Sequence, residues 1–159
     1  MTKNDLFQLL ENLMAFENQA GVKFNYAISR NIDIVAKECD RLRDIAKPDS
    51  KFLEYNAKRI ELLESLADKA EDGTFVMGTL PNGLSSYTLT TGKEEFDAKI
   101  LLLQEEYIDA ISAQTVRSAE IDEFMQEESD LVLYTLKSEH IPAALTPKQI
   151  RSISAIFID

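Results

Sequence analysis

The chain has 159 residues, and its formal net charge of −11 arises from 28 acidic and 17 basic side chains. This length suits one domain, and a hydrophobic fraction of 45% is enough to build a core. Such an acidic chain repels nucleic acid and anionic membranes, so we expect neither as a direct partner. The single cysteine excludes an internal disulfide framework, and no signal-peptide pattern or transmembrane run is present, which predicts a cytoplasmic protein.

Apolar residues that recur every three or four positions predict three helices in the first half of the chain. The first, residues 4–19, has an apolar sector wide enough to be covered on more than one side, by other elements or by a second copy. The second covers residues 22–46 and ends before Pro48, which cannot continue the helical hydrogen-bond ladder. The third covers residues 51–71. Because the turn between the second and third helices is short, we expect them to be antiparallel neighbours.

The periodicity then changes to one typical of strands. Residues 74–79 and 84–90 are rich in β-branched and aromatic side chains, and the Asn82-Gly83 dipeptide between them indicates a hairpin turn. Residues 130–137 predict a further strand. Since an isolated two-stranded hairpin is marginally stable in water, this strand would complete a three-stranded sheet with the hairpin. The alternative is that the long helix carries the strand to the opposite end of the bundle and the hairpin stays two-stranded.

The longest uninterrupted apolar pattern covers residues 93–127 and predicts one helix of roughly 50 Å at about 1.5 Å per residue. Thr91 and Glu94 have the spacing of a capping box at its start. A helix of this length needs other long helices beside it, which predicts an antiparallel helical hairpin or three-helix bundle. Residues 94–128 contain 11 acidic and 2 basic side chains, so this helix carries most of the excess negative charge.

The chain ends in a short predicted helix, residues 147–154, in which Thr146 is the expected N-cap and Pro147 the first helical residue. Its apolar end must dock or bind something, and we expect it to dock on its own chain. The pattern as a whole predicts a mainly α member of the α+β class, folded as a single domain over residues 1–159.

No residue pattern predicts catalysis, so we expect a protein that is not an enzyme. His140, the only histidine, is expected in a surface loop, and Cys39 is expected in the core as a small hydrophobe. The paired carboxylates lack the Glu-x-x-His spacing of a di-iron bundle, and no phosphate-binding glycine motif occurs, so neither a metal nor a cofactor is expected. The alternative is an enzyme whose site is assembled from scattered Asp, Glu, Tyr and Lys residues.

Acidic side chains of the long helix are the candidate residues for binding a partner. They are Glu105, Glu106, Asp109, Glu120 and Glu123. Such a helix face attracts basic surfaces. The plain structural explanation is a solvated face that keeps the protein in solution.

Three segments carry a resemblance to a known family: Gly21 to Asn31, Glu54 to Leu62, and Ile141-Pro142 with Leu145 to Ile150. In these segments the chain is similar to DUF1617, a family of small proteins of unknown function encoded by tailed phages and prophages of Gram-positive bacteria. The resemblance implies a phage setting and therefore the cytoplasm of a bacterial host. It brings no function and no catalytic residue with it.

We therefore expect a non-enzymatic, phage-encoded module that binds a host or phage protein. One form is an inhibitor of a host defence system, whose acidic helix occupies a basic channel made for nucleic acid. The alternative is a virion or tail-assembly component or an assembly chaperone, in which apolar helix faces form contacts between copies.

Overall fold

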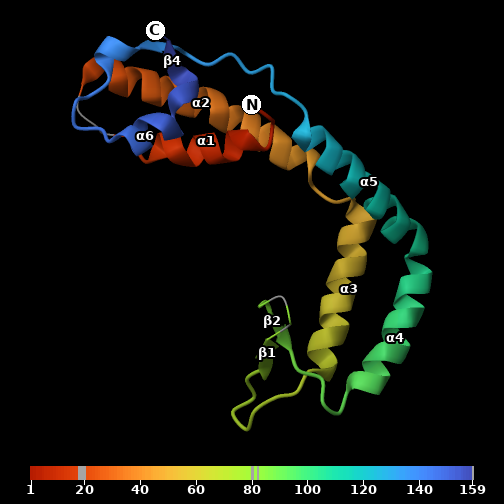
Figure 1. The fold of residues 1–159 in the computed structure, drawn as a ribbon. Helices are drawn as coiled ribbons and strands as arrows, with labels where there is room; N and C mark the ends of the chain where they lie inside the picture. The colour runs from red at the N-terminus through yellow and green to blue at the C-terminus, as the bar shows by residue number, and fades with distance from the viewer. Residues whose placement is uncertain (18–20, 80, 82, 159) are drawn as a thin grey trace. The chain divides into compact units, whose positions relative to one another are not determined.

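The computed structural model describes residues 1–17, 21–79, 81 and 83–158. The fold is α+β and mainly α, as the sequence predicts, with a small antiparallel sheet and a short C-terminal helix (Figure 1). The chain divides into two compact units. The first unit comprises Met1–Lys47 and Ser118–Asp159, and the second unit comprises Pro48–Arg117.

Two antiparallel helices, α1 (Asp5–Met14) and α2 (Val22–Ile45), build the first unit (Figure 1). The periodic apolar residues of both helices meet in one core. They are Leu6, Leu9, Leu10 and Leu13 of α1 with Phe24, Ala27, Ile28, Val35, Cys39 and Leu42 of α2. α1 is shorter than the predicted helix over residues 4–19, of which residues 18–19 lie outside the described part of the chain.

The C-terminal segment docks on this helix pair, as expected. α6 (Pro147–Ser152) begins at a capping box in which the Thr146 hydroxyl accepts a hydrogen bond from the backbone N–H of Gln149 at 3.3 Å. The short helix η2 (Ser154–Ile156) follows, and the side chains of Ile153 and Ile156 are fully buried.

The expected three-stranded sheet is wrong. Of residues 130–137, only β3 (Leu136–Lys137) is a strand, and it pairs in parallel with β4 (Phe157–Ile158) of the same unit. Residues 129–135, which precede β3, have no regular secondary structure and pass beside α2 (Figure 1). There the fully buried Asn31 side chain forms the hydrogen bonds that a neighbouring strand would otherwise supply. Its amide donates to the Tyr134 carbonyl oxygen and accepts from the Tyr134 N–H, each at 2.8 Å. The short helix η1 (Ser138–His140) follows β3.

The second unit consists of α3 (Ser50–Leu66), a β-hairpin and α4 (Lys93–Glu106), and it also contains the first part of α5 (Ile108–Gln126). α3 and α4 pack side by side and antiparallel (Figure 1). The predicted hairpin is present as β1 (Met77–Thr79) and β2 (Ser85–Tyr87), with Gly78 opposite Ser86. Leu80 and Asn82 lie outside the described residues, so the turn between the strands is not assigned.

α2 packs on α1, and α3 packs on α4, each within its own unit. The expected pairing of the second helix with the third would lie between the two units and stays a prediction. Two local expectations for this part of the chain are wrong. The third helix ends at Leu66 rather than at residue 71, since the next residue turns extended and Asp68 pairs with the hairpin through its backbone. The predicted helix over residues 93–127 is divided at Tyr107.

Gly92, not Thr91, is the residue that caps α4, and the capping box expected from Thr91 and Glu94 does not form. A Cβ at Gly92 would lie 2.5 Å from the carbonyl oxygen of Leu66. Only glycine lets the start of α4 approach the end of α3 so closely. Asp68 adds a second link, because its carboxylate accepts from the Thr90 N–H at 2.8 Å and from the Thr90 hydroxyl at 2.6 Å.

Candidate functional site

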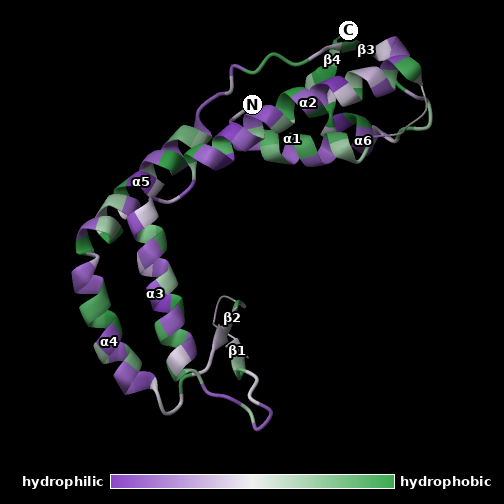
Figure 2. Cartoon of the chain, turned by 180° about the vertical axis from the view of Figure 1, so that it is seen from behind, coloured by the Kyte–Doolittle hydropathy of each residue, from purple (hydrophilic) through white to green (hydrophobic). Residues whose placement is uncertain are grey.

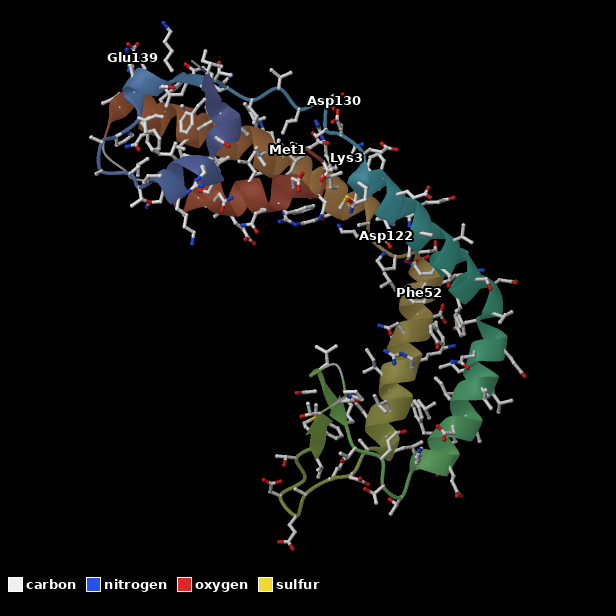
Figure 3. All side chains as sticks on the ribbon, viewed as in Figure 1. Met1, Lys3, Phe52, Asp122, Asp130 and Glu139 are labelled. Atoms are coloured by element: carbon white, nitrogen blue, oxygen red, sulfur yellow. The ribbon has the colours of Figure 1, made fainter. Side chains whose placement is uncertain are left out.

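The five predicted acidic residues are all exposed, but they fall in different units. Glu105 and Glu106 at the end of α4 and Asp109 at the start of α5 belong to the second unit. Glu120 and Glu123 lie further along α5, in the part that belongs to the first unit, on the same stretch as Asp122 (Figure 3). The structure therefore groups the first three residues into one candidate site and separates the other two from it.

Tyr107 anchors this acidic site to α3. Of residues 93–126, all of which the structure describes, it is the only buried one. Its hydroxyl donates to Glu54 Oε1 at 2.6 Å and accepts from Lys58 Nζ at 2.6 Å, while its ring lies 5.9 Å from that of Tyr55. Lys58 Nζ also lies 3.2 Å from Glu106 Oε1. Tyr107 is the residue at which the predicted long helix is divided into α4 and α5, so these contacts lie at the point of division.

The same contacts shift the proton affinities of the three groups. The Tyr107 hydroxyl, followed by Lys58, lowers the pKa of the Glu54 carboxyl. Hydrogen bonds from Lys58 to Tyr107 and Glu106 raise the pKa of the ammonium group. Glu54 raises the pKa of the Tyr107 phenol more than Lys58 lowers it. Glu54 and Lys58 are thus held charged and Tyr107 neutral, which is the arrangement of a structural anchor rather than of a group that exchanges protons near neutral pH.

A shallow pocket of about 290 Å³ adjoins the anchor and is lined partly by two of the predicted residues. Glu106 and Asp109 border it together with Glu54 and Lys51. Three carboxylates and one ammonium group give this pocket a negative balance. Within the described part of the chain, neither Glu105 nor Asp109 has a basic group within 4.0 Å, so these two charges are open to an external cation.

Large apolar side chains lie exposed among these carboxylates. The exposed fractions are 60% for Leu101, 67% for Leu102, 58% for Ile108 and 60% for Val116. Hydrophobic and hydrophilic residues both occur all along α4 and α5 (Figure 2). The backbone ladder continues through the division, from the Tyr107 N–H to Leu103 O at 3.1 Å and from the Ile111 N–H to Tyr107 O at 3.0 Å.

Residues seven positions apart therefore lie on one side of this helical stretch. Leu101 and Ile108 form one such set, and a neighbouring set consists of Leu102, Asp109 and Val116. We call the surface formed by Leu101, Leu102, Glu105, Ile108, Asp109 and Val116 the acidic–apolar face. The sequence identified the acids of this face but not its exposed apolar residues, because packed and exposed apolar side chains can follow the same helical spacing.

The remaining chemically reactive residues do not assemble around this face. No group of three or more His, Cys, Asp or Glu side chains in the described chain is arranged to hold a metal ion. Cys39 is in the core, as expected, and burial raises the pKa of its thiol. Nor does any helix among the described residues have the length and apolar character needed to cross a membrane.

A second, larger pocket lies in the first unit and was not predicted from the sequence. Its volume is about 460 Å³, and it opens beside the N-terminal end of α2. His140 lines it and is partly buried, with Nε2 at 3.1 Å from Lys23 Nζ. These two residues are separated by 117 positions in the chain, so no local pattern connects them.

Comparison of the chain with protein-family models, with curated proteins and with solved structures finds no match.

Proposed function

We propose that the protein is a non-enzymatic binding module that recognises a partner protein through the acidic–apolar face. The observation that carries this proposal is the exposure of four large apolar side chains among unpaired carboxylates in one helical stretch. A solvated surface needs the charges but gains nothing from the exposed leucine, isoleucine and valine residues. A protein interface uses both, because its core is apolar and its charges select the partner.

The two kinds of side chain supply different parts of the binding free energy. Full burial of a Leu, Ile or Val side chain is worth about 1.5–3 kcal/mol, so covering four side chains that are roughly 60% exposed contributes about 1–2 kcal/mol each. Glu105 and Asp109 contribute mainly through faster association and through exclusion of partners without matching positive charge. The partner surface is therefore basic and contains apolar pockets.

The sequence resemblance to the phage family is the basis on which we propose that this interaction takes place in the cytoplasm of a bacterial host. A host defence protein with a basic channel for nucleic acid offers the required charge, and occupation of that channel by the acidic–apolar face would inhibit it. The apolar residues distinguish this mode from a purely electrostatic mimic of nucleic acid. Binding should weaken with added salt but retain a salt-independent part.

The test is a quantitative pull-down from lysate of a Gram-positive host, at low and high salt, with captured proteins identified by mass spectrometry. Three baits are compared: the wild type, Glu105→Lys with Asp109→Lys, and a matched control, Glu120→Lys with Glu123→Lys. Both double variants change the net charge equally, and all four positions are exposed. We expect the first variant to capture at least about tenfold less of a specific host partner than the wild type does. Its two introduced lysines would face the basic groups of the partner, and like charges repel.

Equal capture by the wild type and the first variant would refute the assignment of the site. Equal loss in both variants would mean that net charge alone drives the interaction. A third variant, Leu102→Ser with Val116→Ser, reports the apolar contribution. We expect it to lower capture at high salt, where electrostatic attraction is screened.

The alternative function is that of a phage structural component or assembly chaperone, in which the same apolar side chains contact other copies or other virion proteins. Light scattering after size-exclusion chromatography separates the two functions. A monomer at micromolar concentration supports the binding module, whereas assembly that is abolished by Leu102→Ser with Val116→Ser supports the structural function.

A further inference from the structure

We propose that the pocket of the first unit binds a small nucleotide-like molecule, in which a phosphate group meets Lys23 and Lys137 and a planar ring stacks on Tyr26 or Tyr134. This site is independent of the acidic–apolar face, because all of its lining residues belong to the first unit. Nothing in the proposed protein-binding function requires it.

The pocket has the size and lining of a small-molecule site. Its volume of about 460 Å³ falls within the range of roughly 300–1,000 Å³ that is usual for such sites. The side chains that determine its character are two tyrosines, two lysines, one histidine and Val22. They come from the start of α2 and from residues 134–140, which the fold brings together at the end of the unit where Glu139 is labelled in Figure 3.

Positive charge is concentrated in this pocket although the chain as a whole has a net charge of −11. Lys23 Nζ lies 3.1 Å from His140 Nε2, a nitrogen that can accept from the ammonium group but cannot neutralise it. Within the described part of the chain, no carboxylate lies within 4.0 Å of the ammonium group of Lys23 or Lys137. Glu139 is the nearby acid, and its Oε1 lies 3.5 Å from His140 Nε2. Two ammonium groups at one pocket, neither of them paired with a carboxylate of the described residues, favour an anion.

Aromatic surface is exposed beside these charges. The rings of Tyr26 and Tyr134 contact edge to face, with centroids 5.5 Å apart and an interplanar angle of 83°. Their exposed fractions are 56% and 41%, so each ring leaves part of its surface uncovered by the protein. Stacking on such a ring stabilises any planar base. A simple inorganic anion would use the lysines but not the rings, and an uncharged aromatic ligand would use the rings but not the lysines.

The backbone that presents these groups is held in place before a ligand arrives. Asn31 binds both the N–H and the carbonyl oxygen of Tyr134. Parallel pairing of Leu136 with Phe157, and of Lys137 with Ile158, fixes the neighbouring residues. A preorganised site loses little conformational entropy on binding, which leaves more of the contact free energy for affinity.

A small ligand fits the charge distribution better than a nucleic-acid polymer. The field of an acidic chain repels a polyanion at long range, whereas a mononucleotide carries few charges and is screened at physiological ionic strength. The proposed ligand class is therefore a nucleoside monophosphate or diphosphate.

The experiment is a titration of the full chain with AMP and ADP, followed by isothermal calorimetry and by amide chemical shifts in NMR. Adenosine tests the ring alone, while ribose 5-phosphate and inorganic phosphate test the anion alone. We expect saturable binding of the nucleotides, weaker binding of every partial ligand, and shifts centred on Tyr26, Tyr134 and Lys137. An acidic peptide is included as the competing macromolecular ligand, and its preferential binding would overturn the nucleotide assignment.

Exposed side chains allow variants that leave the core intact. Lys23→Gln with Lys137→Gln should weaken nucleotide binding by at least about tenfold while leaving adenosine binding unchanged, since charged hydrogen bonds are lost. Tyr134→Leu should weaken AMP and adenosine alike, by about tenfold, through loss of stacking. Lys37→Gln, an exposed position on the same helix outside the pocket, is the matched control and should bind as the wild type does.

The proposal fails if neither nucleotide saturates the protein at millimolar concentration. It also fails if the lysine double variant binds nucleotide as tightly as the wild type, or if the Lys37 control loses as much affinity as that variant. Amide spectra of every variant establish that the first unit is folded, so loss of binding is distinguished from loss of structure.

Discussion

Replacing Asn31 with alanine should destabilise the first unit more than any surface substitution on α2. Asn31 is fully buried, and its side-chain amide makes three hydrogen bonds. Nδ2 donates to Ala27 O at 2.9 Å and to Tyr134 O at 2.8 Å, and Oδ1 accepts from the Tyr134 N–H at 2.8 Å. Alanine removes all three and leaves both polar groups of the Tyr134 backbone without a protein partner.

The magnitude follows from those two groups. An unsatisfied buried donor or acceptor costs about 1–3 kcal/mol, and partial access of water at Tyr134 favours the lower half of that range. Ala27 O keeps its helical partner and adds little. Two groups at about 1–1.5 kcal/mol, with a further contribution from the small cavity left by the amide, give a loss of about 2–4 kcal/mol in the free energy of unfolding.

Urea unfolding followed by circular dichroism measures this loss, and hydrogen exchange of the Tyr134 amide locates it. Asp33→Ala, an exposed position on α2, is the control and should change the stability by less than about 0.5 kcal/mol. Asn31→Asp should be at least as destabilising as Asn31→Ala, because it places a carboxylate oxygen against two carbonyl oxygens. A loss below about 1 kcal/mol for Asn31→Ala, with unchanged protection of the Tyr134 amide, would refute the reasoning.

Three further predictions concern other parts of the chain. Gly92→Ala should destabilise the second unit by about 1–3 kcal/mol in thermal unfolding, because its Cβ would lie 2.5 Å from Leu66 O and the packing of α4 on α3 must open; no measurable change would contradict the close approach. Hydrogen bonds from Thr90 lower the pKa of Asp68 below its ordinary 3.8, so their stabilising effect is present above that pH and is lost as the pH falls through the folded-state pKa. Exchange of the Thr90 amide should therefore accelerate in acid, and Asp68→Asn should remove that pH dependence. Cys39 should react with a thiol reagent slowly in the native protein and rapidly in urea, because it is fully buried and burial raises its thiol pKa; fast native labelling would contradict its place in the core.

Local patterns in the sequence correctly predicted the elements whose packing depends on their own periodicity. The steps of three and four from Phe24 to Leu42 predict the buried stripe of α2 because any helix with that spacing has one apolar side. Thr146 and Pro147 predict the start of α6 because capping involves residues a few positions apart. The hairpin strands were predicted for the same reason, by composition over a few residues.

Pairings between distant segments were not predictable in this way. The packing of α1 on α2 was not predicted, because the apolar sector of α1 is equally compatible with several partners. The segment before β3 carries a strand pattern, yet its backbone partner is the side chain of Asn31, which no strand-pairing rule anticipates. In the candidate site, helical spacing placed Glu105, Glu106 and Asp109 on exposed positions but gave no sign of the boundary that separates them from Glu120.

The division of the chain has a consequence for the order in which it folds during synthesis. The second unit is continuous, so all of its residues are synthesised before the C-terminal part of the first unit, which begins at Ser118. The first unit cannot complete its fold until its C-terminal part has been synthesised. Thr2 pairs with Glu128, and the Lys3 N–H donates to Glu127 O at 3.0 Å. β3 pairs with β4, which lies at residues 157–158. Until then the leucines of α1 lack the C-terminal part of their cover. Early folding of the inserted segment shortens the flexible loop that must be closed, and so lowers the entropic cost of joining the two ends.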